Sequence, residues 1–361
     1  MLITILIFIA ILLVLVLSHE AGHFFSARLF GIKVEEFGFG IPPRIAGIRS
    51  KKGILYSFNL LPFGGFVKIF GEEGESASNP ESFGSKPAYA RASVLGAGIA
   101  ANILLAYLVF SALLTFGIPE VVPEDQAVGK TPISILDVSP NSPAYDAGFF
   151  VSDQIKKIAS ESEEIFPSKI QDVQDFISKN KGKLVKILFE RNGSSFEKEI
   201  YPRSNPPEGE GPLGVSLGFL QLKKTPFYRA PIEGAVLTGQ VIRATLFGFY
   251  DIVTALFKDE AAKIEVAGPV GIFNLVSLAK SSGFRSLLMF LGLLSVNLAI
   301  INLLPIPGLD GGRLFFLLIE SARGSRISPR TSNLFHTAGL IALIALMLLI
   351  TYHDLIRLFK I

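Results

Sequence analysis

The fold is decided by residues 2–29, LITILIFIAILLVLVLSHEAGHFFSARL, a long apolar run that the polar residues Ser18, His19 and Glu20 interrupt. Between Leu2 and Leu17 only Thr4 is polar, and the apolar character resumes after residue 20. A helix needs roughly 20 apolar residues to cross a bilayer, so the stretch predicts a spanning helix. A cleaved signal peptide is the competing interpretation. It fits poorly, because no Lys or Arg precedes the run and no small-residue cleavage site follows it.

Three further stretches have the length and apolar character of spanning helices: Ser93 to Phe116, Leu287 to Leu304 and Phe335 to Tyr352. Of the 361 residues, 50% are hydrophobic and 18% are charged, a composition too apolar for an ordinary soluble enzyme. We therefore expect an α-helical polytopic membrane protein with about four transmembrane helices. The absence of Cys excludes disulfides and thiolate ligands, and a formal charge of +3 with scattered basic residues indicates no nucleic-acid partner.

Nine Lys and Arg residues lie between the first two spans, and four Arg residues lie in the loop before the fourth span. By the positive-inside rule both loops face the cytoplasm, and the N-terminus and the polar segment 117–286 lie outside. The stretch from Ala235 to Phe257 is apolar enough for a fifth span but contains Gln240, Arg243 and Asp251. Because charges at membrane depth are costly, an amphipathic helix on the outer membrane surface is the favoured interpretation.

Residues 19–23, His-Glu-Ala-Gly-His, form an H-E-x-x-H pattern on the first predicted helix. The i, i+4 spacing places the imidazoles of His19 and His23 on one helix face, beside Glu20. In metalloproteases with this pattern the two His bind zinc and the Glu is the general base. A chance match, or two His packed at a helix end, is the alternative. Ionisable residues inside a spanning helix are expensive and mark functional sites, which favours a zinc site.

Two His leave a zinc ion one protein ligand short, and Asp310 is the candidate. It lies in residues 302–312, NLLPIPGLDGG, at the end of the third predicted span. The prolines prevent a regular helix there, and irregular backbone at that depth must be buried in protein or line a watery cavity. At about 1.5 Å per residue, His19 lies roughly 26 Å along its helix, near the cytoplasmic end. Asp310 reaches the same end provided that the stretch from Ala235 to Phe257 does not span.

These two motifs, in this order, resemble the site-2 protease family, and the domain inserted between them is similar to the arrangement in bacterial regulators of sigma-E protease. The second motif matches the family pattern N-x-x-P-x-P-x-L-D-G-G in full, and further similarity covers residues 38–43, 61–68 and 96–102. The resemblance implies zinc-dependent proteolysis inside the membrane, with Zn²⁺ held by His19, His23 and Asp310 and with Glu20 as general base. It also implies a multi-pass protein of the bacterial inner membrane, with its active site near the cytoplasmic side.

The resemblance further implies a substrate-binding region. In the family, the segment similar to 34–70 is a membrane-associated β-hairpin that helps to hold the substrate in extended form, which assigns Gly64 and Gly65 to substrate binding. The family motif gives the same role to Asn302, Pro305 and Pro307. A surface hairpin, and an Asn that packs between spans, are the alternatives.

The second span contains a further motif with Gly96, Gly98 and Asn102. These residues either take part in the site or only pack the helix against its neighbours. It departs from relatives at Ile99, where they often have proline. A single PDZ-like unit, where some relatives carry two, is the second departure.

The inserted segment resembles the permuted PDZ domains of bacterial proteases. It predicts a strand from Ile133, a helix with an inward face of Ile170, Val173, Phe176 and Ile177, strands at 184–190 and 196–201, and a last strand near 213–217. PDZ domains bind peptides by adding a strand to a sheet edge, so peptide chain ends are an expected partner. A structural spacer is the alternative.

The expected organisation is a membrane core at 1–116, a PDZ-like domain at 125–220 outside the cytoplasm, an amphipathic linker region at 228–286 and a second membrane core at 287–361. The expected partners are the lipid bilayer and membrane-spanning substrates. The expected activity is regulated cleavage of a single-span signalling protein, such as an anti-sigma factor after prior trimming, and of signal-peptide remnants. A catalytically inactive membrane PDZ receptor or scaffold is the alternative, which an intact H-E-x-x-H motif with a third ligand disfavours.

Overall fold

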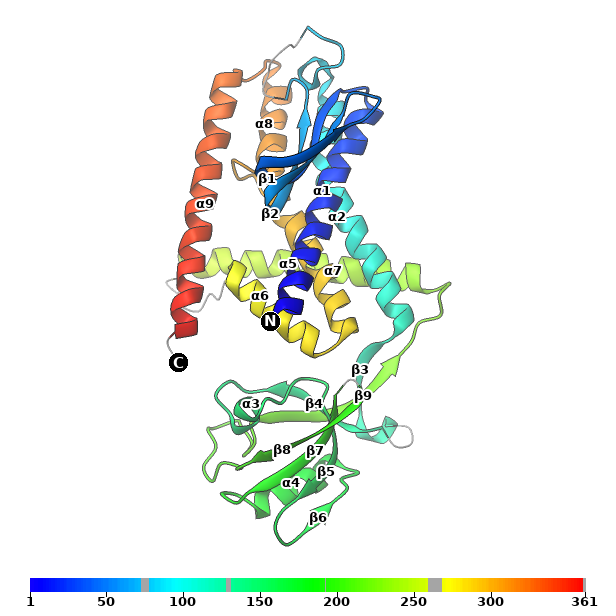
Figure 1. Ribbon diagram of the computed structural model, residues 1–361, viewed down its shortest axis with the longest axis vertical. Helices are drawn as coiled ribbons and strands as arrows, with labels where there is room; N and C mark the ends of the chain where they lie inside the picture. Colours follow the sequence, from blue (N-terminus) through cyan, green and yellow to red (C-terminus); the bar gives the residue numbers. More distant parts are fainter. Residues whose placement is uncertain (73–77, 128–130, 192, 259–267, 360–361) are drawn as a thin grey trace. The chain divides into compact units, whose positions relative to one another are not determined.

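The computed structural model describes residues 1–72, 78–127, 131–191, 193–258 and 268–359 (Figure 1). The chain forms two compact units. The first, the membrane unit, comprises residues 1–112, 231–277 and 288–361, and the second, the inserted unit, comprises 113–230 and 278–287.

The four predicted spans are all helices: α1 (Leu2–Leu29), α2 (Ala88–Phe116), α7 (Phe284–Leu303) and α9 (Pro329–Phe359). Helices α2 and α9 begin several residues before the predicted apolar stretches. Among the described residues five helices are long and apolar enough to cross a membrane, and the fifth is α5 (Ala230–Phe257). The helical membrane character predicted from the sequence is therefore confirmed, while four spans remains a prediction.

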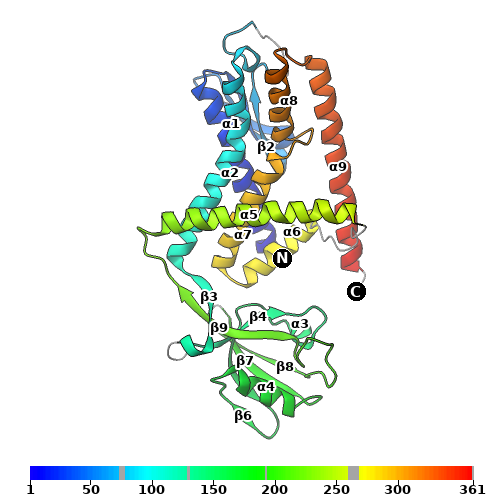
Figure 2. The same cartoon turned by 180° about the vertical axis from the view of Figure 1, so that it is seen from behind.

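Helix α5 lies crosswise to α1, α2 and α9 (Figures 1 and 2). Near its start a Cβ at Gly234 would overlap Ser111 of α2, so the two helices touch there. Further along, Thr245 Oγ1 donates to Asn297 Oδ1 of α7 at 3.0 Å. The short helix α6 (Pro269–Ser281) precedes α7. These contacts hold α5 against α2 and α7 while its axis runs across them.

Helices α1 and α2 pack closely because small residues face each other. A Cβ at Gly22 of α1 would overlap the carbonyl of Ala97 on α2. Such close approach of backbones is how helices associate in lipid, where apolar burial drives association little. One buried cluster then joins α1, the hairpin, α2 and α8 (Asp310–Arg323), formed by Phe24, Ala27, Ile32, Val34, Ile54, Ile69, Phe83, Val94, Leu95 and Leu317.

The predicted hairpin is present as β1 (Val34–Arg49) and β2 (Leu55–Ile69), which pair antiparallel. Their register is irregular: Phe37 lies opposite Val67 and also opposite Tyr56. The first part of β1 is therefore flanked on both sides by β2, while residues 44–49 lie opposite 55–59. Phe24 of α1 meets Phe37 edge-on, with ring centroids 5.5 Å apart, which fixes the sheet against the helix.

The inserted unit is built on a seven-stranded sheet of order β3-β9-β4-β5-β7-β8, with β6 paired to β5. Its strands are β3 (Ile118–Val122), β4 (Ile133–Val138), β5 (Gln154–Ala159), β6 (Glu164–Ile165), β7 (Val185–Arg191), β8 (Ser194–Ile200) and β9 (Val215–Lys223). The helices are α3 (Pro143–Ala147) and α4 (Ile170–Lys179), and short 3₁₀ turns lie at Phe83–Ser85 and Glu124–Gln126.

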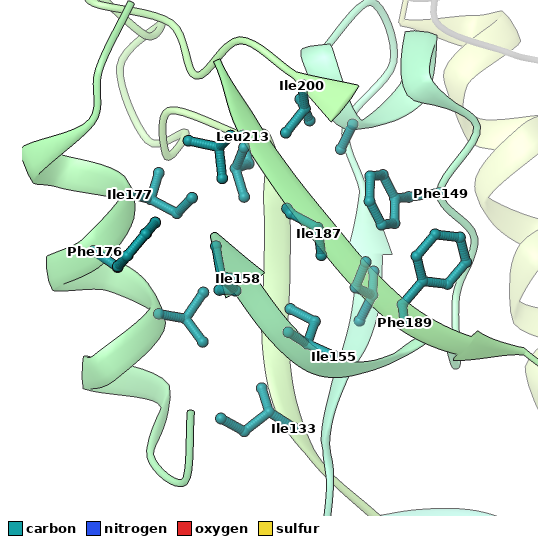
Figure 3. Close-up of a cluster of buried hydrophobic side chains, with 14 of the residues drawn as sticks. Ile133, Phe149, Ile155, Ile158, Phe176, Ile177, Ile187, Phe189, Ile200 and Leu213 are labelled. Carbon is teal, nitrogen blue, oxygen red and sulfur yellow. The ribbon is translucent and has the colours of Figure 1, made fainter. Parts of the chain in front are cut away.

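The core of the inserted unit lies between α4 and the sheet (Figure 3). Val173, Phe176 and Ile177 of α4 are buried, which confirms the predicted inward face, and Ile158 and Ile187 of the strands meet them. The last strand is longer than predicted, because β9 continues to Lys223 to pair with β3.

Candidate metal centre

Three side chains from two distant parts of the chain meet at one point in the membrane unit. Nε2 of His19 lies 3.1 Å from Nε2 of His23. Oδ2 of Asp310 lies 3.0 Å from the first and 3.1 Å from the second. Both His are buried and Asp310 is nearly so. The predicted ligand set is thus brought together.

The geometry of these three atoms fits a metal. Ligand atoms around a tetrahedral zinc lie at about 2.0–2.1 Å from the ion and therefore roughly 3.3 Å from one another. The three atom–atom distances here, 3.0–3.1 Å, are close to that value. Oδ2 of Asp310 is buried without a hydrogen-bond partner in the described part of the chain. Two nitrogens and one carboxylate oxygen are a zinc donor set with one position left open.

The surroundings orient the imidazoles. Nδ1 of His23 lies 2.8 Å from the carbonyl oxygen of Val94 on α2, so that nitrogen carries the proton and Nε2 presents its lone pair to the metal position. The rings are accommodated by a glycine: a Cβ at Gly98 would lie 2.5 Å from His23 Nε2 and 2.7 Å from His19 Cε1. At Gly96 nothing lies within 4 Å of such an atom. Gly98 therefore makes room for both ligands, a role in the site in addition to helix packing.

Asp310 is positioned by the irregular segment between α7 and α8. Helix α7 ends at Leu303, and Gly308 has a positive φ of 96°, which a side chain would disfavour. A Cβ at Gly311 or Gly312 would overlap carbonyl oxygens of the preceding segment. The two glycines let α8 start directly against this turn, with Asp310 as its first residue.

Helix α9 braces the same segment from outside, a feature absent from the sequence reasoning. Gly308 N–H donates to His336 Nδ1 at 3.1 Å, and a Cβ at Gly339 would overlap the Pro307 carbonyl. The signal that could have identified His336 is its ionisable ring within the last apolar helix.

Glu20 lies beside the ligands and is in contact with the hairpin. A Cβ at Gly65 would lie 3.6 Å from Cγ of Glu20. Gly64 has a φ of 96°, and a Cβ there would lie 3.6 Å from Cγ1 of Ile41. The end of β2 that contains the two predicted glycines therefore reaches the metal centre.

The remaining predicted residues lie on the Asp310 segment. Asn302 is half-buried in the last turn of α7, Pro305 is exposed and Pro307 is half-buried. On α2, Asn102 is fully buried, and neither polar atom of its side chain has a partner among the described residues. It is one helical turn from Gly98, which places an unpaired amide close to the ligands.

Comparison with known proteins shows the family of the chain and several relatives. A family model described as peptidase family M50 matches residues 7–346. A predicted zinc metalloprotease of Clostridium perfringens is 33% identical over 345 residues, covering 95% of this chain and 95% of that protein. Zinc metalloprotease RasP of Oceanobacillus iheyensis is 27% identical over 439 residues, covering 99% of each. Among solved structures, the PDZ domain of an SdrC-like protein of Listeria monocytogenes matches 25% of this chain and 90% of that chain, at 22% identity and a TM-score of 0.22.

Proposed function

Because the chain belongs to peptidase family M50, the site-2 protease family, it is a zinc metalloprotease, and we propose that it cleaves membrane-anchored proteins within the bilayer. The observation that carries the proposal is the triangle of ligand atoms, with 3.0–3.1 Å between each pair. Two of its corners stand on α1, an apolar helix long enough to span a membrane, and the third follows the end of α7, another such helix. An apolar substrate segment can reach such a site only from within the lipid or through a cavity in it.

We assign the metal to His19, His23 and Asp310, and the general-base role to Glu20. When bound, zinc supplies a nucleophile at neutral pH by lowering the pKa of water to about 7. A Glu20 carboxylate oxygen takes the proton from the attacking water and passes it to the leaving amide nitrogen.

The substrate is proposed to lie in extended form between the end of β2 and the segment before Asp310. Gly64 and Gly65 keep side chains away from this space, and Gly65 adjoins Glu20. An extended chain would pair with the β2 backbone by strand addition. Asn302, Pro305 and Pro307 would contact it from the opposite side. Hydrolysis needs extended substrate, because a helix hides its carbonyl groups in its own hydrogen bonds.

We propose the orientation predicted from the basic loops, with the metal centre near the cytoplasmic side of a bacterial inner membrane and the inserted unit outside. The meeting of His19 with Asp310 supports a surface position for α5, since a spanning α5 would bring the end of α7 to the opposite side. The crosswise direction of α5 agrees with that position (Figure 2).

The inserted unit is proposed to be a PDZ-like domain, placed at about 125–220 and joined through β3 and β9, that selects substrates without contributing to the chemistry. Its strands and α4 follow the pattern predicted for a permuted PDZ domain. A folded unit tethered outside the membrane would exclude substrates with bulky outer domains and admit trimmed ones, such as a single-span anti-sigma factor, and signal-peptide remnants. Its sheet edge would hold a newly exposed chain end.

The test is cleavage of a tagged single-span substrate reconstituted with the zinc-loaded protein in lipid vesicles. We expect fragments whose masses place the cut inside the apolar segment, and no cleavage by Glu20→Gln. Glu35→Gln is the matched control, because Glu35 pairs with Lys68 and is neither a ligand nor the general base in our assignment. A cut confined to the soluble flanks would show that the protein is not an intramembrane protease.

A further inference from the structure

The membrane unit contains a cavity of about 270 Å³ between α2, α8, the start of α9 and the residues after β2. Its charged lining consists of Glu72, Arg91, Arg313, Glu320 and Arg326. No proposed zinc ligand lines it, and neither does Glu20. The proteolytic chemistry therefore leaves the cavity unexplained.

The acidic groups of the cavity are already paired. Arg91 Nη1 donates to Glu320 Oε2 at 3.0 Å, and the other oxygen of Glu320 accepts from the backbone N–H of Ile327 at 3.1 Å. Arg313 pairs with Glu72. Arg326 is exposed and has no ion pair in the described part of the chain. Three Arg against two Glu leave the lining with one net positive charge.

The cavity lining also has two buried N–H groups without an acceptor among the described residues. His336 lines the cavity, and because its Nδ1 accepts the Gly308 N–H, the ring proton must be on Nε2. That Nε2–H and the Nε–H of Arg91 are both buried, and neither has an acceptor among the residues described. A buried donor without an acceptor is unfavourable, so the pair predicts a ligand that brings acceptor oxygens.

We propose that this cavity binds a phosphate group, supplied either by the head group of an anionic phospholipid or by free inorganic phosphate. Its oxygens accept from His336 and Arg91, and the single charge of a phosphodiester balances the lining. The cavity volume is at the lower limit of small-molecule sites, which suits a head group.

The position of the cavity favours the lipid source. Helix α8 ends at Arg323 and α9, an apolar helix long enough to span, begins at Pro329, so the cavity lies at the end of a candidate span. Basic pockets between helices at that level bind lipid head groups. The imidazole of His336 packs edge-on against Phe316, which also lines the cavity, at 5.3 Å between centroids, and this contact restrains the ring.

The test uses delipidated, zinc-loaded full-length protein. Equilibrium dialysis with radiolabelled inorganic phosphate measures binding of the free anion. Native mass spectrometry after incubation in micelles with phosphatidylglycerol, and separately with phosphatidylcholine, measures retained lipid. We expect retention of phosphatidylglycerol in preference to phosphatidylcholine, whose choline cancels the charge of its phosphate.

Three variants decide the assignment. Arg326→Gln should weaken binding about fivefold, the effect of one basic group near a membrane surface. His336→Asn keeps an acceptor for Gly308 at the Nδ1 position and removes the Nε2 donor, and should also weaken binding about fivefold. Arg323→Gln, exposed at the end of α8 and outside the lining, is the matched control and should bind as the wild type does.

Each outcome has a defined meaning. Phosphatidylglycerol retention that falls in both cavity variants supports the head-group source, and phosphate binding with the same dependence but no lipid retention supports the free anion. Equal affinity in Arg326→Gln, His336→Asn and Arg323→Gln would overturn the proposal, and so would the absence of binding to both probes.

Discussion

Gly98→Ala is expected to displace both imidazoles of the metal centre while leaving the helix intact. The added Cβ would lie 2.5 Å from His23 Nε2 and 2.7 Å from His19 Cε1. Ordinary contacts are about 3.5–4.0 Å, so the rings must retreat by about 1 Å, whereas metal–ligand distances tolerate about 0.2 Å. Overpacking of this kind costs about 1–3 kcal/mol, which corresponds to about a 5- to 150-fold loss of zinc affinity.

The assay is competition for zinc against a chromogenic chelator, with cleavage measured on the same samples. Gly96→Ala is the matched control, because it makes the same change two residues away on α2, where nothing lies within 4 Å of the new atom. It should bind zinc as the wild type does. If Gly98→Ala bound zinc as tightly as Gly96→Ala, the placement of the two imidazoles against α2 would be wrong.

Three other predictions concern stability and topology. Ile158→Ala should destabilise the inserted unit by about 2–5 kcal/mol in chemical unfolding, because Ile158 is fully buried, and a loss below about 1 kcal/mol would contradict the core of Figure 3. Backbone N–H groups before α4 donate to Asp172 and hold the pKa of its carboxyl below the usual range, so its stabilisation is present above about pH 4 and is lost as pH falls through the lowered value. Asp172→Asn should therefore reduce the acid sensitivity of unfolding, and an unchanged pH profile would refute this. Reporter tags at Lys51 and Arg326 should be cytoplasmic and a tag at Glu197 should be outside; tags at Lys51 and Arg326 on opposite sides would be incompatible with a shared metal.

The metal ligands could be predicted from the sequence because membrane depth restricts where ionisable residues can lie. His19 and His23 are related by the helical repeat, and the depth of Asp310 follows from the number of spans that precede it. The structure brings these three together. The buried face of α4 was predictable for a similar reason, since its apolar residues recur at helical spacing.

Contacts between helices could not be predicted in this way. The role of Gly98 depends on which face of α2 meets α1, and no local pattern reveals that face. The support of Gly308 by His336 joins residues 28 positions apart, one in the turn before α8 and the other in α9. The double pairing of Phe37 in the hairpin arises from how β2 folds back, and alternating apolar residues do not encode it.

Zinc content and cleavage measured together in Glu20→Gln and Asp310→Ala test the central claim most directly. The assignment predicts that Glu20→Gln keeps about one zinc per chain and cleaves nothing, because its carboxylate moves protons and is no ligand. Asp310→Ala should lose zinc and cleavage together, since it removes one of three protein ligands. Full zinc affinity in Asp310→Ala, or loss of zinc in Glu20→Gln, would contradict the proposed metal centre.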